Sequence, residues 1–410
     1  MTLISASAAA SAAVPLPLGS NPEPAGAIFT AAGLLLPHLE RGERVDAAAL
    51  RVAMETAFGA SDATGAWDWK TAYDACEAAT VLFLRKYGRA LFRKAGSPAA
   101  RLSALSKIAN LLPTHTRRST ESQTFQQFST PIPLGLVAAC AAAITPADRV
   151  LEPSAGTGLF AIFAEIAGGA LVLNELADTR ASLLSLLFPA IPVARFDATQ
   201  IDDHLDPAVT PSVVLMNPPF SAMANVEGRI ADTTYRHVAS ALARLTPGGR
   251  LVTITGANFA SDNLAWRDAF IRLQARGRIV FSAAIDGAVY AKHGTTFPTR
   301  LTVIDKLPAD DPAVFPAAPG VASNAATLLG WLDDHLPTRL AVDPSLTVPA
   351  VAAYVPRSVR GYINRTAKAV PAAVPMAEPE GLPLSYETQD GLAGEDGRLS
   401  DGIYEPTFPK

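Results

Sequence analysis

Apolar side chains recur at helical spacing over the first part of the chain. Val45, Leu50, Met54 and Phe58 follow one another at four or five positions, close to one helical turn, and similar spacing continues towards residue 112. A repeat of this period is typical of helices that bury one face. The pattern predicts an α-helical region over residues 28–120.

A different pattern begins near residue 149, where six short apolar runs alternate with longer segments of helical spacing. The runs predict strands at residues 149–153, 170–176, 192–198, 212–217, 250–256 and 278–285. The segments between them predict helices at residues 158–168, 177–187, 235–249 and 263–277. Strands joined through helices pair in parallel, so the alternation predicts a doubly wound α/β domain, with helices on both faces of a mostly parallel sheet.

The two ends of the chain have a third texture. Residues 1–27 are rich in Ala and contain no Lys or Arg, which favours a disordered leader over an export signal. Beyond residue 307, Pro- and Ala-rich segments surround one short amphipathic helix, and residues 376–410 hold eight acidic and two basic side chains. Such a composition favours an extended tail. We therefore expect a leader (1–27), a helical region (28–120), an α/β domain (121–307), and a linker and tail (308–410).

Composition restricts the class of protein further. With 410 residues, 49% hydrophobic and 18% charged, the chain can bury a sizeable core. Cys76 and Cys140 form neither a disulfide framework nor a metal-ligand pattern, and no run approaches the about 18 apolar residues of a membrane span. We expect a cytoplasmic protein with no membrane partner. The six histidines show no ligand spacing, so no metal is expected.

Positive charge is concentrated between Arg85 and Arg118, where nine basic residues occur without an acidic one, although the net charge is −4. Such a segment could neutralise nucleic-acid phosphates, and a solvated helix face would have the same composition. The residues that we expect at a nucleic-acid backbone are Arg85, Lys86, Arg93, Lys94, Arg117 and Arg118.

A glycine-containing turn joins the first predicted strand to its helix in the stretch RVLEPSAGTGLF. Gly156 and Gly158 allow a tight turn and the close approach of a ligand, while the following helix begins with unpaired N–H groups. The motif alone could be an ordinary strand-to-helix turn. A nucleotide-binding P-loop is excluded because no Gly-Lys-Ser/Thr follows.

Acidic residues stand at the ends of the first three predicted strands. They are Glu152, Glu175 and Asp197, and Glu175 follows the glycines by about twenty positions. An acid at that distance suits the two hydroxyls of a ribose, and Asp197 can accept a hydrogen bond from an adenine amine. Together the three acids predict a site with the shape of a nucleoside.

The fourth predicted strand runs into Asn217-Pro218-Pro219-Phe220. Two prolines cannot donate to a sheet ladder, so the strand must stop at Asn217. A Phe directly after them is poorly placed for the core. The corner is therefore either a strand terminator or part of a site.

Four motifs in order resemble the S-adenosylmethionine-dependent amino-methyltransferases. They are QQFSTP (126–131), EPSAGTG (152–158), NPPF (217–220) and GTTFPTRLTVIDK (294–306), and their order is similar to that of the DNA adenine-N6 enzymes whose cofactor half comes first. The resemblance implies a Rossmann-like class I methyltransferase fold with a seven-stranded sheet, and S-adenosyl-L-methionine as cofactor.

Other stretches resemble the methyltransferase half of bacterial and plasmid strawberry-notch-type methylase/helicase proteins. They include WDWKTAYDACEAATVLFLRK (67–86), LLPTHTRRS (111–119) and AAIDGAVYAKHGTT (283–296). This resemblance implies a helicase domain or protein as a partner. The chain itself contains no Walker-type loop, so we expect no ATPase activity.

The resemblance also implies roles for single residues. The catalytic residues are Asn217, Pro218, Pro219 and Phe220, of which Phe220 would stack on the target base. Phe297 is the candidate for the other face of the base, and it could equally be an ordinary core aromatic. The implied cofactor-binding residues are Phe128, Thr130, Glu152, Pro153, Ser154, Ala155, Gly156, Thr157, Gly158, Glu175 and Asp197.

The resulting hypothesis is methyl transfer to adenine N6 in DNA, with the base flipped out of the duplex. The alternatives are an RNA base, a protein glutamine, and an idle DNA-binding module of a helicase-associated machine. A separate target-recognition domain is not evident, because the chain after the last predicted strands contains only linker, one short helix and residues 354–369. Those residues could contact nucleic acid or form a loose connector.

Overall fold

The computed structural model describes residues 23–115, 129–219 and 231–342 of the chain. Four long helices come first: α1 (Pro24–Arg41), α2 (Ala47–Phe58), α3 (Trp69–Ala95) and α4 (Pro98–Leu111), with a 3₁₀ turn η1 (Asp62–Thr64) before α3. These helices occupy residues 24–111 of the region 28–120 that the pattern predicts as helical, beginning a few residues earlier than expected, and residues 116–120 lie outside the described ranges.

Each helix start has a local cause. Asp46, Asp68 and Ser97 precede α2, α3 and α4 and accept hydrogen bonds from the third backbone N–H that follows, which stabilises a helix by about 1 kcal/mol. α1 begins with Pro24, whose missing N–H costs nothing at that position.

The sheet has the strands β1 (Arg149–Glu152), β2 (Ala170–Asn174), β3 (Val193–Ala194), β4 (Val213–Met216), β5 (Arg250–Gly256), β6 (Arg278–Ile285), β7 (Thr299–Asp305) and β8 (Val321–Ala322). Their spatial order is β3-β2-β1-β4-β5-β7-β6-β8. Both pairings of β7 are antiparallel and the other five are parallel. The predicted fold class, an α/β sheet that is mostly parallel, is confirmed, and β8 extends the expected seven strands to eight.

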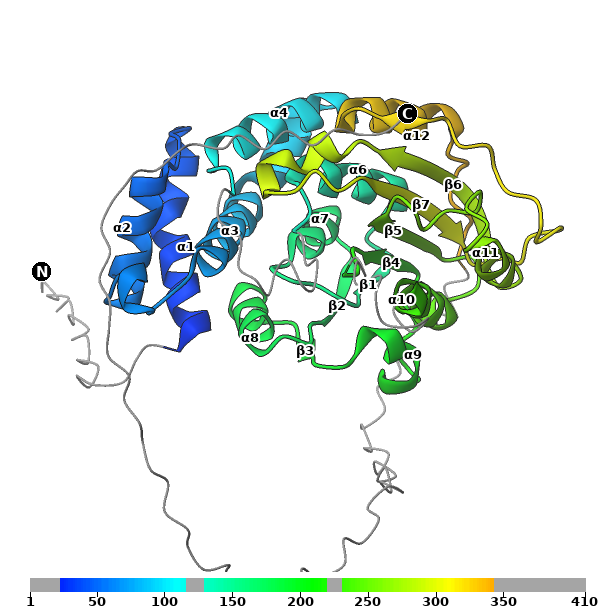
Figure 1. Ribbon diagram of the computed structural model, residues 1–410, viewed down its shortest axis with the longest axis horizontal. Helices are drawn as coiled ribbons and strands as arrows, with labels where there is room; N and C mark the ends of the chain where they lie inside the picture. Colours follow the sequence, from blue (N-terminus) through cyan, green and yellow to red (C-terminus); the bar gives the residue numbers. More distant parts are fainter. Residues whose placement is uncertain (1–22, 116–128, 220–230, 343–410) are drawn as a thin grey trace, which may run out of the picture. The chain divides into compact units, whose positions relative to one another are not determined.

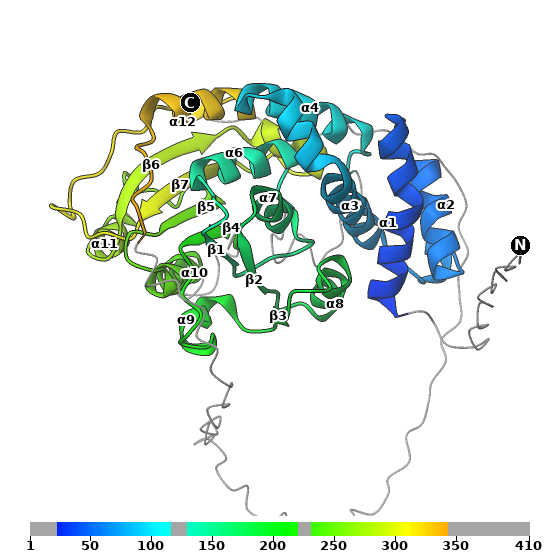
Figure 2. The ribbon, with the colours of Figure 1, turned by 180° about the vertical axis from the view of Figure 1, so that it is seen from behind.

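Helices cover both faces of this sheet (Figures 1 and 2). On one face lie α6 (Ile132–Ala142), α7 (Leu159–Ala167), α8 (Asp178–Leu187) and α12 (Ala325–His335), and on the other α9 (Ile201–His204), α10 (Ala231–Arg244) and α11 (Arg267–Gln274). Successive strand residues point to opposite faces. Val213 and Leu215 accordingly join the first core, and Val214 and Met216 join the second.

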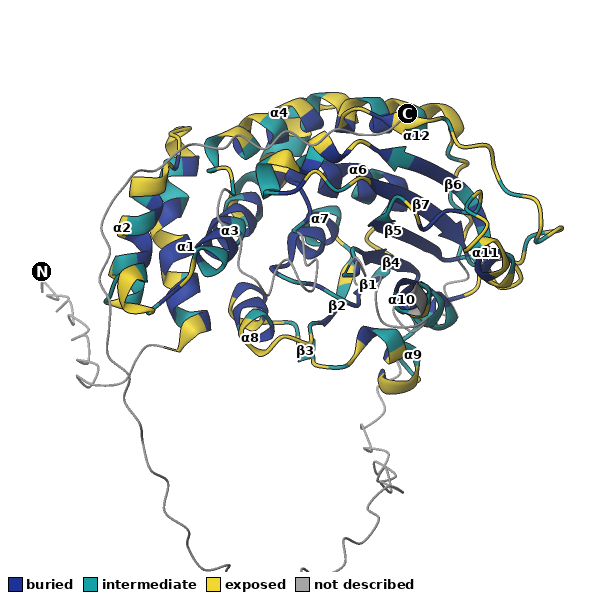
Figure 3. Ribbon diagram, viewed as in Figure 1, coloured by how far each residue is buried: buried dark blue, intermediate teal, exposed yellow. Residues whose placement is uncertain are grey.

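Burial follows this layering. The central strands are buried along their length, whereas the outer sides of α2, α4 and α12 face solvent (Figure 3). The helices α1 and α3 lie next to each other and contact α8, so the helical region continues the first core beyond the sheet. No helix in the described ranges is both long and apolar enough to cross a membrane.

Some predicted element bounds differ from the structure. β3 has two residues where residues 192–198 were expected, because Asp197 begins a 3₁₀ turn, η2 (Ala198–Gln200), by accepting from Thr199 N–H. The helix expected from residue 263 begins at Arg267, since the Asn263 side chain accepts from Ala265 N–H and forms a turn. A 3₁₀ helix, η3 (Gly287–His293), lies between β6 and β7.

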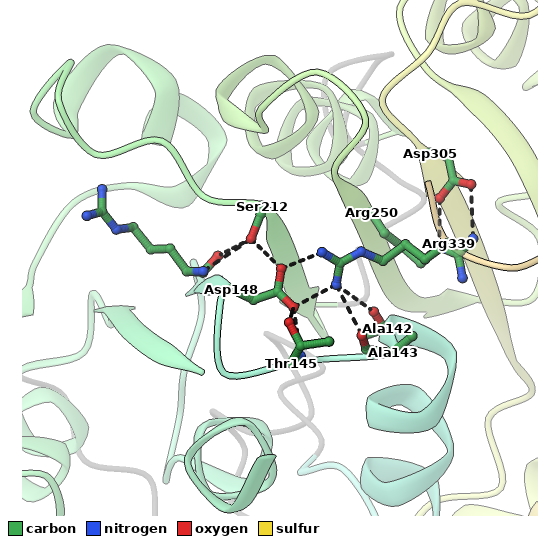
Figure 4. Close-up of polar contacts among 9 residues, drawn as sticks. Ala142, Ala143, Thr145, Asp148, Ser212, Arg250, Asp305 and Arg339 are labelled. Atoms are coloured by element: carbon green, nitrogen blue, oxygen red, sulfur yellow. Dashed lines mark hydrogen bonds and ion pairs between the residues drawn. The ribbon is translucent and has the colours of Figure 1, made fainter. Parts of the chain in front are cut away.

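Residues 308–342, expected as linker around a short helix, contribute β8 and α12 to the sheet and its cover. The segment after α12 is tied to the sheet by one ion pair and one hydrogen bond, next to a second, buried ion pair between β5 and β7 (Figure 4). Arg339 pairs with Asp148, and Arg250 pairs with Asp305 and donates to the carbonyl of Pro337. The remainder of the expected linker and tail, and the expected leader up to residue 22, lie outside the described residues.

Candidate active site

Four neighbouring parallel strands, β3, β2, β1 and β4, end at the same edge of the sheet. The residues at or just after their ends are Asp197, Glu175, Glu152 and Asn217, in that spatial order. Adjacent strands are about 4.8 Å apart. The sheet therefore arranges these side chains in a row about 14 Å long at its carboxyl edge.

One cavity of about 410 Å³ follows this row, a volume typical of cofactor sites. Its lining includes most of the residues predicted from the sequence, namely Thr130, Glu152, Pro153, Ser154, Ala155, Gly156, Thr157, Glu175, Asp197, Asn217, Pro218 and Pro219. Phe128 and Phe220 lie outside the described residues. The structure thus brings the described residues that were predicted to bind a cofactor to one space with the Asn-Pro-Pro corner, except for Gly158, which is not among the lining residues.

The glycine turn has the conformation that the sequence requires. Gly156 and Gly158 have φ angles of 55° and 84°, in the left-handed region that only glycine adopts at little cost. A Cβ atom on Gly158 would lie 2.5 Å from the ring of Phe188, whereas Gly156 has open space at that position. Gly158 is therefore needed for close packing, and Gly156 leaves room for a ligand.

Two backbone N–H groups hold the carboxylate of Glu175. Gly156 donates to Oε2 at 2.7 Å and Ala177 donates to Oε1 at 2.9 Å. The side chain is half-buried and lines the cavity. Asp197, by contrast, is exposed, and its Oδ1 accepts from Thr199 N–H at 2.9 Å. Both acids are thus oriented by hydrogen bonds from backbone N–H groups.

Asn174, a residue that the sequence did not single out, ties three strand ends together. Its Nδ2 donates to the carbonyls of Pro153 and Phe196 at 2.8 and 2.9 Å, and its Oδ1 accepts from Phe196 N–H at 2.8 Å. The residue is fully buried at the end of β2. It fixes the position of the glycine turn relative to the segment that carries Asp197.

Glu152 is the most buried acid of the row, with 3% of its surface exposed. Burial raises the pKa of its carboxyl well above the ordinary value, and hydrogen bonds from the N–H groups of Ala161 and Phe160 act in the opposite direction. Within the described ranges its Oε2 has no hydrogen-bond partner. A buried carboxyl in this state is suited to a cationic ligand group.

At the other end of the row, Asn217 is held by a residue from the segment before α6. Its Nδ2 donates to Thr130 Oγ1 at 3.0 Å, which selects one orientation of the amide. Pro218 is buried and Pro219 is half-buried, and both line the cavity. Phe297 lies in the turn before β7 and packs against the first core and Gly256, and it is not part of the cavity lining.

The predicted nucleic-acid residues have different surroundings. Arg85 pairs with Glu165 at 3.0 Å and lies over the ring of Phe188, and Lys86 pairs with Glu40 at 2.7 Å. Arg93 and Lys94 are exposed in the last turn of α3. The α3 residue that lines the cavity is Glu77, and at 1.5 Å per residue Arg93 lies about 24 Å from it along the helix. Arg117 and Arg118 lie outside the described residues.

Ionisable side chains from helices that the sequence analysis did not assign to the cavity also line it. Glu77 of α3 accepts from Thr157 Oγ1 at 2.6 Å, and Arg180 of α8 pairs with Asp74 at 2.9 Å. His237 of α10 is another lining residue, and burial lowers its pKa to about 4, so it is neutral at pH 7. No local sequence signal marks these residues, because each lies on an ordinary helix.

Metal-binding groups were not expected. Within the three described ranges, no three His, Cys, Asp or Glu side chains are arranged to hold a metal ion.

Comparison with known proteins gives structural matches only. No protein-family model and no curated protein sequence matches this chain. A putative class I S-adenosylmethionine-dependent methyltransferase from Listeria monocytogenes is 14% identical, with a TM-score of 0.39, and the match covers 80% of this chain and 96% of that one.

Two other matches are TrmN from Thermus thermophilus and a modification subunit of a putative type I restriction enzyme from Vibrio vulnificus YJ016. TrmN is 20% identical with a TM-score of 0.34, covering 46% of this chain and 52% of that one. The Vibrio subunit is 15% identical with a TM-score of 0.39, covering 58% and 60%. The chain thus spans between half and two thirds of these two structures. At these identities and TM-scores the function has to be argued from the site.

Proposed function

We propose that this protein is an S-adenosylmethionine-dependent N-methyltransferase that acts on adenine N6 in DNA. The observation that carries the proposal is the single cavity that joins the acids at three strand ends, the glycine turn and the Asn-Pro-Pro corner. If Pro218 and Pro219 served only to end β4, the glycine turn and the acids at the neighbouring strand ends would not be needed, because prolines can end a strand without them.

The cavity suits the parts of the cofactor in order along the sheet edge. Asp197 would accept from the adenine amine, and Glu175 would accept from the ribose hydroxyls. Glu152, with its carboxyl oxygen that has no partner within the described ranges, would lie at the methionine end beside the glycine turn. The open space at Gly156 supports the same placement, because a side chain there would occupy the cavity.

Asn217 and Pro218 would prepare the amine for reaction. The lone pair of an exocyclic amine is delocalised into the ring, so the nitrogen is a poor nucleophile. The Thr130 hydroxyl holds the Asn217 amide by its Nδ2, with Oδ1 as the acceptor atom of that amide. If Oδ1 and the Pro218 carbonyl accept the two amine N–H bonds, the lone pair is directed away from the ring, and positive charge that develops on nitrogen is stabilised.

The cofactor supplies a methyl group bound to a positively charged sulfur. No residue with a tuned pKa is needed to remove the amine proton, because the methylated ammonium is acidic enough to lose it to water. We propose that Phe220 stacks on the flipped base, and that Phe297 contributes only if the segment before β7 moves toward the cavity.

We further propose that phosphate contacts come from Arg93, Lys94, Arg117 and Arg118. Arg85 and Lys86 are less suited to this role, because Glu165 and Glu40 already pair with them. Replacing Arg93 and Lys94 together with Gln is expected to reduce the salt dependence of DNA affinity by about 1 to 2 in the log–log slope. An unchanged slope would remove both residues from the contact. A helicase partner follows only from the sequence resemblance and forms part of the same proposal.

The test is transfer of labelled methyl groups from the cofactor to double-stranded DNA, single-stranded DNA, RNA or protein. We expect label in N6-methyladenine of DNA, loss of transfer in Asn217→Ala, and full transfer in Asn263→Ala, whose amide lies in the turn after β5, outside the cavity. Label only in RNA or in protein glutamine would refute the DNA substrate. Cofactor binding without any transfer would favour an idle DNA-binding module.

A further inference from the structure

Helix α3 of the N-terminal region contributes an acidic side chain to the cavity. Glu77 lines it, and its Oε2 accepts from the Thr157 hydroxyl in the glycine turn at 2.6 Å. Ser129, beside Thr130, is within hydrogen-bonding range of the same carboxyl. The two residues that it contacts come from the glycine turn and the segment before α6, so Glu77 lies at the methionine end of the cavity.

A pair of charged residues acts electrostatically on the carboxyl of Glu77. Asp74, one turn earlier on α3, accepts two hydrogen bonds from the guanidinium of Arg180, in a bidentate pair, and Arg180 also lines the cavity. The charged and titratable groups near Glu77 are Asp74, Cys76, His115, Glu152, Arg180, Lys292 and His293. The positive charge of Arg180 thus interacts with Asp74 and also with the acids of the cavity, Glu77 and Glu175.

The excess of carboxyl groups over cations indicates which ligand group this end of the cavity would bind. Asp74, Glu77, Glu152 and Glu175 are four acids, and Arg180 is the cation among the described lining residues and their direct partners. Burial and the charge of Asp74 raise the pKa of Glu77 to about 7. A buried site with this excess of carboxyl groups is stabilised by a cation that donates hydrogen bonds.

The ammonium of an amino acid meets that requirement, and the sulfonium does not, because sulfur has no hydrogen to donate. We propose that Glu77 is a cofactor-binding residue that accepts hydrogen bonds from the α-ammonium of the methionine part, with Asp74 and Arg180 as positioning residues. This inference rests on the proposed function. It makes the N-terminal helical region an integral part of the cofactor site.

The experiment compares three ligands by calorimetry. S-adenosylmethionine and S-adenosylhomocysteine both carry the α-ammonium, whereas 5′-methylthioadenosine carries the nucleoside without the amino-acid part. In Glu77→Gln the affinity for the first two should fall about tenfold or more, as expected for loss of a charge-assisted hydrogen bond. The affinity for 5′-methylthioadenosine should change less than about twofold.

Glu77→Gln preserves the shape of the side chain and an oxygen that can accept from Thr157. Retained binding of 5′-methylthioadenosine would show that the variant is folded. Glu55→Gln on α2, outside the cavity, is the matched control and should bind all three ligands like the unmodified protein.

The possible failures are distinguishable. If the unmodified protein binds none of the three ligands, the proposed function fails together with this inference. If it binds them and Glu77→Gln loses affinity for all three equally, or for none, the proposed function stands and the assignment of Glu77 is overturned.

Discussion

Replacing Asn174 with Ala should disconnect the strand ends that form the cavity. The substitution removes the partner of three backbone groups, the Phe196 N–H and the carbonyls of Pro153 and Phe196. Each unpaired buried group costs about 1 to 3 kcal/mol. Pro153 and Phe196 line the cavity, so water can replace part of this loss. We therefore expect a decrease of about 3 to 4 kcal/mol in the free energy of unfolding.

The assay is urea unfolding followed by circular dichroism, with Asn324→Ala as the matched control. Asn324 caps α12 on the surface and accepts from Thr327 N–H, so its replacement should cost about 1 kcal/mol. Asn174→Ala should also weaken 5′-methylthioadenosine binding, because the segments under Glu175 and Asp197 lose their connection. If both variants cost the same within about 0.5 kcal/mol, Asn174 does not have the structural role inferred for it.

Three further predictions follow from single contacts. Gly158→Ala should lower the midpoint of urea unfolding and weaken cofactor binding, because the new Cβ would lie 2.5 Å from the Phe188 ring and the residue has a φ of 84°. An unchanged midpoint would contradict the close approach of Phe188 to Gly158. Arg250→Met should destabilise the protein by about 3 to 5 kcal/mol, because it leaves the buried Asp305 carboxyl without its partner; the double variant with Asp305→Leu should recover stability in the same unfolding assay. Cofactor affinity, measured by calorimetry, should rise as pH increases from about 5.5 to 7.5, and the slope should be smaller in Glu77→Gln, where Glu152 is the remaining buried acid at this end of the cavity; an unchanged slope would assign the titration to another group.

The sign of that pH dependence follows from the free protein. The pKa of Glu77 is raised to about 7, so below this pH the carboxyl must lose a proton before it can bind an ammonium. The neighbouring His115 and His293 have pKa values lowered to about 4 and about 3 by burial, and they remain neutral over the measured range. Above about pH 8 the α-ammonium itself loses its proton, which sets the upper limit of the experiment.

The opposite sign applies to stability. An acid whose pKa is raised on folding favours the folded state while it is protonated. The contribution of Glu77 is therefore present below its unfolded pKa near 4.5 and is lost as the pH rises through about 7. Binding and stability should thus change in opposite directions over this range, and measuring both separates them.

Much of the fold was determined by short-range patterns. The alternation of apolar runs and helical segments predicted the strands and the doubly wound sheet, because the periods of strands and helices are set by neighbours within a few residues. Gly156, Gly158 and the two prolines after Asn217 carry their conformational consequence in their own chemistry. The row of acids at the sheet edge followed, because the carboxyl ends of parallel strands meet at one edge.

Tertiary structure decided what no local pattern contains. Glu77 meets Thr157 across 80 positions and Arg339 meets Asp148 across 191, and only the packing of α3 and of the segment after α12 brings these pairs together. For the same reason Arg85 and Lys86, which the sequence presented as part of a basic segment, have Glu165 and Glu40 as partners. The sequence shows which residues are charged, whereas the partner of each charge depends on which helices pack together. The packing of α3 against the α/β domain placed Glu77, which no sequence motif singles out, in the cavity.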